Sequence, residues 1–139
     1  MRKKKKVFHR VYERLGVVKV GEVVDFLPTK NNKKSTKKDF FGESVRLTSH
    51  RYRVYKKKGT ICAQCDLEGT FFALEKSLAQ TTKKYHFNLY GVDNHGQEIM
   101  ITVDHIIPRA KGGLDTIDNK QPMCFICNNK KGDKLPNAT

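Results

Sequence analysis

Hydrophobic and polar positions alternate most clearly in the second half of the chain. Short apolar runs occur at residues 70–74 (TFFAL), 86–90 (HFNLY) and 98–103 (EIMITV), with turn-forming residues between them. Runs of this length that are rich in Phe, Leu and Ile predict β-strands. Because the last two are joined by GVDNHG, a stretch with Asp, Asn and Gly, the pattern predicts a β-hairpin there.

The pattern changes after this hairpin. Two glycines at 112–113 mark a turn, and residues 124–131 lack the alternation of a strand. This last segment ends in lysines followed by Gly132, which is typical of the C-terminus of a short helix. The order hairpin, loop and helix indicates an α+β fold.

The first 60 residues have weaker patterns. Residues 7–27 alternate slightly and predict one or two short strands, which Pro28 stops. Residues 28–39 (PTKNNKKSTKKD) are basic and turn-rich, and predict a flexible loop. Residues 44–57 predict an amphipathic helix that Ser44 caps and Gly59 ends; its apolar spacing comes from Val45, Thr48, Tyr52 and Tyr55.

Charge divides the chain into two parts. Residues 1–60 contain 19 Lys and Arg against 5 Asp and Glu, a net of +14, whereas residues 61–139 contain 9 of each. The run at residues 1–6 predicts a disordered charged end. We therefore expect two units, a basic nucleic-acid-binding region at residues 1–59 and a working domain at residues 60–139. For residues 1–59, the alternative is a tail that only increases solubility.

The sequence gives no sign of a membrane segment. No run of eighteen apolar residues is present, and the basic start MRKKKKV is not followed by the apolar core of a secretory signal. We expect a cytoplasmic protein. In a reducing compartment, cysteines bind metal or stay free rather than form disulfides.

Four cysteines form two Cys-x-x-Cys pairs, Cys62/Cys65 and Cys124/Cys127, separated by 58 residues. Two intervening residues allow one tight turn to aim both thiolates at one point, and four thiolates complete a tetrahedral Zn²⁺ site with no open position. Such a site is structural, and here it would clamp two distant parts of the chain around the hairpin. A redox-active pair is the alternative, although no thioredoxin-like pattern accompanies it.

The apolar run at 98–103 continues into an Asp-His pair, Asp104 and His105, just before Pro108 and a basic glycine turn. A capped strand with one core histidine is the simplest interpretation. The alternative is half of an active site, because the cysteine clamp would bring Asn128 close to this strand end. A carboxylate and an amide oxygen can hold a hard divalent cation beside an imidazole that takes a proton from water.

One geometric condition applies to this interpretation. Adjacent side chains of a regular strand point to opposite faces, and His105 shares its face with Ile101 and Val103. Asp104 and His105 can serve one site only if the strand ends or twists at this pair. Pro108 and the following turn favour such an ending.

These motifs resemble those of the HNH, or ββα-metal, endonucleases over roughly residues 60–135. The resemblance rests on DHIIPRAKGG, IDNKQPMC and CNNKKGDK, framed by the two Cys pairs. The spacing is similar to that of the HNH domain in RNA-guided CRISPR nucleases, and the stretch from KKKGTICAQC to HFNLYGVD resembles small bacteriophage HNH proteins. The implied fold is a ββα-metal module with a structural four-cysteine zinc site and a basic N-terminal extension.

The resemblance implies a role for each matching residue. His105 would be the general base, Asp104 a ligand of the catalytic metal, and Asn119 the residue that fixes the loop and orients the base. Asn128 stands where many members have a metal-binding histidine. Because an amide oxygen is a harder ligand than imidazole, this difference favours Mg²⁺ or Mn²⁺.

Several basic residues are candidates for contacts with the phosphates of DNA: Arg51, Arg53, Arg109, Lys111, Lys130 and Lys131. The sequence thus predicts a metal-dependent DNA endonuclease or nickase, monomeric or weakly dimeric, located in the host cytoplasm if phage-encoded. A catalytically inactive, zinc-containing nucleic-acid-binding protein is the alternative, and a ribonuclease is a third possibility. Binding alone does not need the set Asp104, His105, Asn119 and Asn128.

Overall fold

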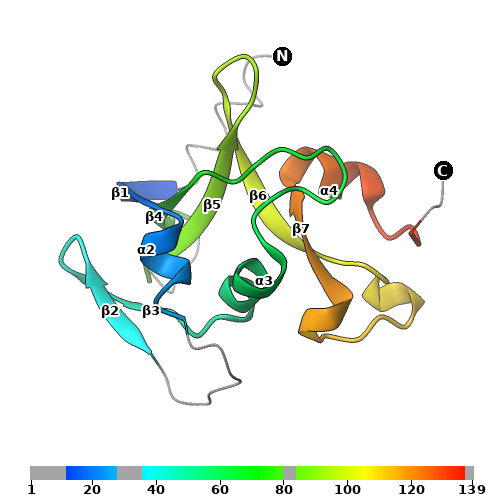
Figure 1. Cartoon of the computed structure of the whole chain (residues 1–139), viewed down its shortest axis with the longest axis horizontal. Helices are drawn as coiled ribbons and strands as arrows, with labels where there is room; N and C mark the ends of the chain where they lie inside the picture. Colours follow the sequence, from blue (N-terminus) through cyan, green and yellow to red (C-terminus); the bar gives the residue numbers. More distant parts are fainter. Residues whose placement is uncertain (1–11, 28–35, 80–83, 137–139) are drawn as a thin grey trace.

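A computed structural model of the 139-residue chain describes residues 12–27, 36–79 and 84–136. Its centre is a five-stranded antiparallel sheet in the order β1-β4-β5-β6-β7 (Figure 1). The strands are β1 (Tyr12–Lys19), β4 (Phe71–Ser77), β5 (His86–Val92), β6 (Glu98–His105) and β7 (Lys120–Cys124). The mixed α+β class predicted from the sequence is confirmed.

The predicted hairpin is the pair β5–β6. Leu89 lies opposite Ile101 and Val92 opposite Glu98, so the register closes on the turn around residues 93–97. The Asp93 carboxylate accepts hydrogen bonds from the backbone N–H groups of His95 and Gln97, at 2.9 Å each. A short polar side chain therefore sets this turn, as the Asp-Asn-Gly composition predicted.

Strand β7 was not predicted from the sequence. It contains Pro122, which cannot donate a ladder hydrogen bond and is tolerated here because β7 is an outer strand of the sheet. β7 leads directly into helix α4 (Phe125–Lys131), which ends at Gly132 as expected. The strand that carries Asp104 and His105 is therefore paired on both sides, with β5 and with β7.

The N-terminal part differs from the sequence predictions in two places. Residues 37–40 are not loop but strand β2 (Lys37–Phe40), which pairs with β3 (Glu43–Arg46). The helix expected from Ser44 is wrong in its first half, because Ser44 and Val45 belong to β3. The two-residue turn explains the hairpin: Phe41 and Gly42 both have positive φ, 53° and 81°, as a type I′ turn requires.

Helix α3 (His50–Lys58) begins after Ser49 and packs on the sheet. Tyr52 and Tyr55 are buried in the core next to Phe72. The Tyr55 hydroxyl donates to the Ile101 carbonyl at 3.0 Å, and the Tyr52 hydroxyl accepts from Phe87 N–H at 2.8 Å. Burial raises the pKa of Tyr55 and keeps its hydroxyl protonated. α3 is thus fixed to the central strands by aromatic packing and by hydroxyl contacts.

Strand β1 is joined to the sheet by a buried polar cluster as well as by pairing with β4. Glu75 is 2% exposed and accepts hydrogen bonds from Arg14, Asn88 and Tyr90, at 2.7, 2.8 and 2.7 Å. Arg14 also contacts Glu98 at 2.9 Å. Its guanidinium lies 4.9 Å from the centre of the Tyr90 ring. Residues from four strands therefore share one network, and β1 and α3 form one structure with the later strands.

The charged run at residues 1–6, part of the predicted strand segment (residues 7–11) and most of the predicted loop (residues 28–35) lie outside the described residues. Helix α2 (Gly21–Val24) follows β1 and buries Val23 against the core. Within residues 12–27, 36–79 and 84–136, the helices are too short and too polar to cross a bilayer.

Candidate functional site

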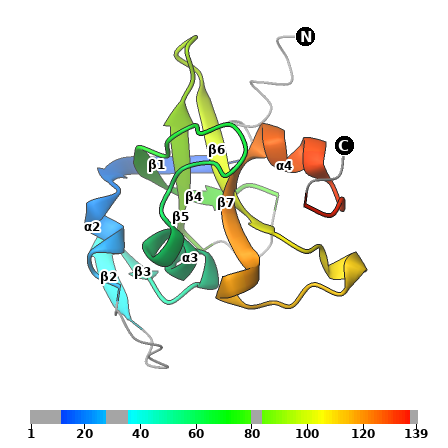
Figure 2. The ribbon, with the colours of Figure 1, turned by 45° about the vertical axis from the view of Figure 1, so that its right-hand side comes forward.

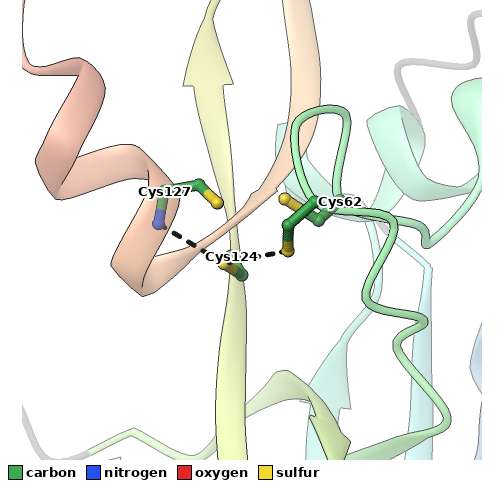
Figure 3. Close-up of side chains that lie close together, drawn as sticks. Cys62, Cys124 and Cys127 are labelled. Carbon is green, nitrogen blue, oxygen red and sulfur yellow. Dashed lines mark hydrogen bonds between the residues drawn. The ribbon is translucent and has the colours of Figure 1, made fainter. Parts of the chain in front are cut away.

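The four cysteines converge on one point, as predicted (Figure 3). Their sulfur atoms all lie within 4.8 Å of one another, and the Cys65 and Cys124 sulfurs are 3.8 Å apart. Four thiolates about 2.3 Å from a tetrahedral Zn²⁺ would lie roughly 3.8 Å from each other. Cys62 and Cys124 are buried. The side chains therefore fit a structural zinc ion.

The cluster joins the loop after α3 to the junction of β7 and α4. Cys124 ends β7 and its sulfur accepts a hydrogen bond from Cys127 N–H at 3.4 Å, in the first turn of α4. The backbone N–H of Ala63 donates to the Pro122 carbonyl at 2.9 Å. Figures 1 and 2 show the segment after α3 crossing the molecule to reach α4. The cluster thus fixes α4 relative to the sheet.

The pKa values of the thiols differ because their surroundings differ. Burial raises the pKa of Cys127 and of Cys124. At Cys62, hydrogen bonds from the backbone of Cys124 and Cys65 outweigh burial, which acts in the opposite direction, and lower the pKa to about 7. Of these three thiols, Cys62 ionises most readily.

Asp104 and His105 are the last two residues of β6, paired with Gln121 and Lys120 of β7. β6 ends at this pair, and both residues are still in register with β7. Asp104 is 6% exposed, and its carboxylate contacts Lys131 Nζ of α4 at 3.2 Å and Gln121 Nε2 at 3.1 Å. Its nearest partners are therefore a cation and an amide donor.

His105 has different neighbours. Its Nε2 lies 3.1 Å from Oδ1 of Asp115, a residue of the loop that connects β6 to β7. Its side chain is 25% exposed, so solvent reaches the ring. The backbone carbonyl of His105 accepts a hydrogen bond from Lys131 Nζ at 2.9 Å. The side chain and the main chain of His105 are both held in place.

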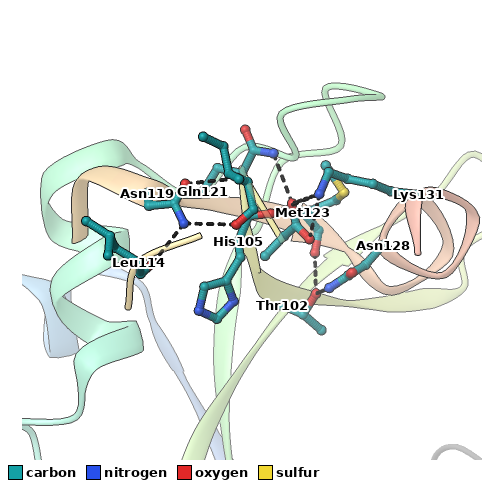
Figure 4. Close-up of polar contacts among 10 residues, drawn as sticks. Thr102, His105, Leu114, Asn119, Gln121, Met123, Asn128 and Lys131 are labelled. Atoms are coloured by element: carbon teal, nitrogen blue, oxygen red, sulfur yellow. Dashed lines mark hydrogen bonds and ion pairs between the residues drawn. The ribbon is translucent and has the colours of Figure 1, made fainter. Parts of the chain in front are cut away.

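Asn119 holds the loop that follows His105 (Figure 4). Its Oδ1 accepts from Ile107 N–H at 2.9 Å, and its Nδ2 donates to the carbonyls of Ile107 and Leu114 at 3.0 and 2.8 Å. The Asn119 carbonyl also accepts from Ile106 N–H at 2.7 Å. These contacts support the loop-fixing role that the resemblance implied.

Asn128 lies in α4 and reaches the same strand end. Its Nδ2 donates to Thr102 Oγ1 at 2.8 Å, which leaves the amide oxygen as the atom able to bind a cation. Asp104, His105 and Asn128 all line one open hollow of about 330 Å³, together with Pro108, Arg109 and Asp133. The structure thus brings three of the four predicted residues to one cavity, and Asn119, on the connecting loop, is not among its lining residues.

The predicted phosphate-binding residues have varied surroundings. Lys111 and Lys130 are exposed, while Lys131 is turned towards Asp104. Arg109 contacts Asp115 at 3.3 Å but stays 68% exposed. Arg51 of α3 donates to the Phe87 carbonyl at 3.0 Å, so its guanidinium also supports the fold, and Arg53 is half-buried on the same helix. Contact with DNA stays a prediction for all six.

Sequence reasoning missed a group of polar residues around Asp104 and His105: His50, Asp115, Lys120 and Gln121. The sequence does not distinguish Asp115 from the nearby Asp118, because both are aspartates in the same loop. In the fold, Asp115 contacts His105, whereas Asp118 pairs with Lys57 at 3.0 Å. His50 belongs to a helix 55 positions earlier in the chain. No local pattern could have identified these residues.

Comparison with known proteins agrees with this geometry. Residues 93–134 match the family model described as HNH endonuclease, so this part of the chain is an HNH endonuclease domain. The match spans β6, the connecting loop, β7 and α4, with the tip of the hairpin before them. Searches of curated proteins and of solved structures each found no match. The HNH family implies nuclease activity by phosphodiester hydrolysis, with nucleic acid as the substrate.

Proposed function

We propose that the protein is a divalent-metal-dependent endonuclease that nicks DNA, with His105 as the general base. The observation that carries this proposal is the meeting of Asp104, His105 and Asn128 at one hollow within the HNH domain. A carboxylate, an imidazole and an amide oxygen that line one hollow are the groups that metal-assisted phosphodiester hydrolysis needs. A single site of this kind cuts one strand, and a double-strand break would require two events.

The donor atoms fit a hard cation. Asp104 offers a nearly buried carboxylate that already holds the ammonium of Lys131, and Asn128 offers an amide oxygen. We propose these two residues as the ligands of Mg²⁺ or Mn²⁺, which prefer oxygen donors. When bound, such an ion neutralises charge on the phosphate and on the departing oxygen.

His105 would take the proton from the attacking water. The water oxygen then forms a bond to phosphorus, the bond from phosphorus to the departing oxygen breaks, and that oxygen takes up a proton from solvent. An imidazole suits this role at neutral pH because it accepts a proton in this range. Asn119 supports the reaction indirectly, since its hydrogen bonds fix the loop that follows His105.

Basic residues would hold the nucleic acid. We propose residues 1–59 as the main DNA-binding region, including Arg51 and Arg53, and residues 60–139 as the HNH unit. Arg109 lines the hollow, and we propose that it contacts phosphates near the cut, together with Lys111, Lys130 and Lys131. The charge of +14 favours binding through the phosphates, which is strongly dependent on salt.

Nicking of supercoiled plasmid tests the proposal. Wild type is compared with His105→Ala and with His95→Ala, an exposed histidine in the β5–β6 turn that serves as the matched control. Each is incubated with EDTA, Mg²⁺ or Mn²⁺. Removing a general base costs about 10²- to 10⁴-fold in rate, so metal-dependent nicking by wild type and His95→Ala should be lost in His105→Ala.

Other outcomes would reject parts of the proposal. Equal nicking by all three proteins would mean that His105 is not the base. Tight DNA binding without metal-dependent cleavage by any of them would favour the inactive zinc-containing binding protein. Preferential cleavage of RNA would mean that RNA, and not DNA, is the substrate.

A further inference from the structure

The imidazole of His105 contacts the carboxylate of Asp115. Asp115 Oδ1 lies 3.1 Å from His105 Nε2. Asp115 belongs to the loop between the short 3-10 helices Arg109–Lys111 and Ile117–Asn119. Its side chain is 57% exposed, and its partners His105 and Arg109 line the hollow. This contact has no part in the roles proposed above.

The direction of the hydrogen bond follows from the charge of Asp115. Hydrogen bonds from Lys120, His105 and Arg109 lower the pKa of Asp115, so the carboxylate is ionised at neutral pH. An ionised carboxylate can only accept hydrogen bonds, so Nε2 of His105 must carry the hydrogen. A neutral ring in this tautomer has its lone pair on Nδ1. Asp115 therefore determines which ring nitrogen is free to accept a proton.

Asp115 is itself held by two cations. Lys120 Nζ lies 2.8 Å from Oδ1 of Asp115, and the Lys120 side chain is only 10% exposed. Lys120 in turn contacts Nδ1 of His50 at the start of α3. Arg109 holds the second oxygen, Oδ2, at 3.3 Å. The contacts run from α3 through β7 to Asp115 and His105, so the carboxylate has little freedom to move away.

We propose that Asp115 is a positioning residue for His105: it holds the ring in the Nε2–H tautomer and aims Nδ1 at the attacking water. The inference rests on the proposed function, in which His105 is the base. When Nδ1 takes the proton from water, the ring becomes an imidazolium whose Nε2–H still faces the carboxylate. Asp115 thus keeps the ring in one orientation before and after the proton transfer, as a carboxylate does beside the histidine of a hydrolase triad.

A purely structural role for Asp115 would predict different behaviour. Asp118, three residues later, is also an aspartate on this loop, and its side chain is 83% exposed and paired with Lys57. It makes an ion pair without contacting His105. Asp118→Ala is therefore a matched control for the loss of a surface ion pair on the same loop.

The experiment compares wild type, Asp115→Ala, Asp115→Glu, Asp118→Ala and His105→Ala, each purified with its metals and checked by thermal melting. Long-range ¹H–¹⁵N spectra report the tautomer of His105, whose signals are assigned by their absence in His105→Ala. Single-turnover nicking at saturating protein reports the chemical step, and DNA binding in EDTA reports affinity.

We expect wild type and Asp118→Ala to have the Nε2–H tautomer and the same nicking rate within about twofold. Asp115→Ala should give a mixture of tautomers and a rate roughly 10- to 100-fold lower, in the range of positioning effects on a general base. Its DNA affinity should be unchanged or higher, because a negative charge beside Arg109 and Lys120 is removed. Asp115→Glu should recover part of the rate.

Two results would overturn the inference: an unchanged tautomer in Asp115→Ala, or a normal nicking rate despite a changed tautomer. A loss of DNA affinity equal to the loss of rate would also overturn it, by assigning Asp115 to binding. If His105→Ala keeps nicking, the proposed function fails, and the ring spectra alone decide whether Asp115 sets the tautomer.

Discussion

Asn119 shows how one amide can organise the end of a strand. Its three side-chain hydrogen bonds bridge Ile107 and Leu114, so the loop between β6 and β7 is closed on itself. An amide is suited to this task because it donates and accepts at once, which neither a carboxylate nor an ammonium does. The loop carries both Arg109 and Asp115, and its shape determines where these residues stand relative to His105.

Asn119→Ala should therefore damage activity more than stability. Three hydrogen bonds are lost, yet the loop is partly exposed and water can replace some of them, so we expect a loss of about 1–2 kcal/mol in the free energy of unfolding. Misplacement of the site should lower the nicking rate at least about tenfold. Urea unfolding and single-turnover nicking measure the two effects.

The control for this variant is Asn129→Ala, an exposed asparagine next to Asn128 in α4. It should behave as wild type in both measurements. A normal nicking rate in Asn119→Ala would show that the loop keeps its shape without the amide.

Residue types and spacing identified Asp104, His105, Asn119 and Asn128, because these residues lie in compact local motifs. Asp115 and His50 could not be found in this way. Their relation to His105 depends on how the loop folds back and on where α3 packs, and both are properties of the whole structure. Residue patterns thus predicted the candidate residues of this site, but not Asp115, which contacts His105, or His50.

At the scale of elements, the predictions succeeded where one pattern covered a whole strand. β4, β5, β6 and α4 lie where their apolar runs and helix end predicted them. The helix expected over residues 44–57 was wrong at its start, because Val45 and Tyr52 share helical spacing while lying in different elements. Gly42 was the available signal for the β2–β3 turn. β7 was missed because Pro122 and a polar start are unusual for a strand.

The cysteine cluster connects the loop after α3 to the junction of β7 and α4. We expect one Zn²⁺ per chain. Cys65→Ser should reduce the zinc content and lower the melting temperature by about 10 °C or more, since a structural metal contributes directly to folding. The nicking rate of Cys65→Ser should also fall, because α4 carries Asn128 and the cluster fixes α4 relative to the sheet. Zinc analysis and thermal melting measure the effect.

Gln64→Ala, an exposed change in the same Cys-x-x-Cys loop, is the control and should keep both zinc and stability. A Cys65→Ser protein with full zinc content and unchanged melting would contradict a four-cysteine site. Fully reversible disulfide formation without zinc would instead support the redox alternative.

The buried cluster around Glu75 predicts a stability effect far from the hollow. Arg14→Met would leave the Glu75 carboxylate, which is 2% exposed, without its cation. Breaking a fully buried ion pair costs about 3–5 kcal/mol, and because Arg14 is partly exposed we expect about 2–3 kcal/mol. Chemical unfolding measures the loss.

Arg46→Met, an exposed arginine in β3, is the matched control and should change the free energy of unfolding by less than about 0.5 kcal/mol. An equal effect of both variants would mean that the network contributes nothing beyond surface charge.

At the scale of the molecule, charge and fold divide the chain differently. The excess positive charge belongs to the first 60 residues, yet β1 and α3 of that region are part of the same sheet and core as the HNH domain. Composition could predict the charge division, whereas the pairing of β1 with β4 is a long-range contact that no local pattern encodes. The described part of the basic region therefore belongs to the same folded unit as the HNH domain.

Removal of residues 1–11 tests the contribution of the basic end. This segment contains six Lys and Arg and no acidic residue. Each lost phosphate contact lowers the dependence of log K on log salt by about 0.9, so the slope should fall by roughly 3–5. DNA binding measured by fluorescence anisotropy over a range of salt concentrations gives this slope.

A full-length variant with residues 2–6 replaced by serine separates charge from length and should show most of the same effect. Nicking at saturating protein should stay within about twofold of wild type in both. An unchanged slope in the truncated protein would assign DNA binding to other residues.

The long-range pairing of this fold also affects the point during synthesis at which the chain can begin to cleave nucleic acid. β1 has no partner until β4 has been synthesised, and Cys62 and Cys65 wait for Cys124 and Cys127 to complete the metal cluster. His105 leaves the ribosome before Asp115, Asn119 and Asn128, the residues proposed to orient it or to complete its site. A chain whose synthesis stops before residue 127 therefore lacks Cys127 and Asn128, and its cysteine cluster is incomplete. Cutting activity should begin only when synthesis of the domain is nearly finished.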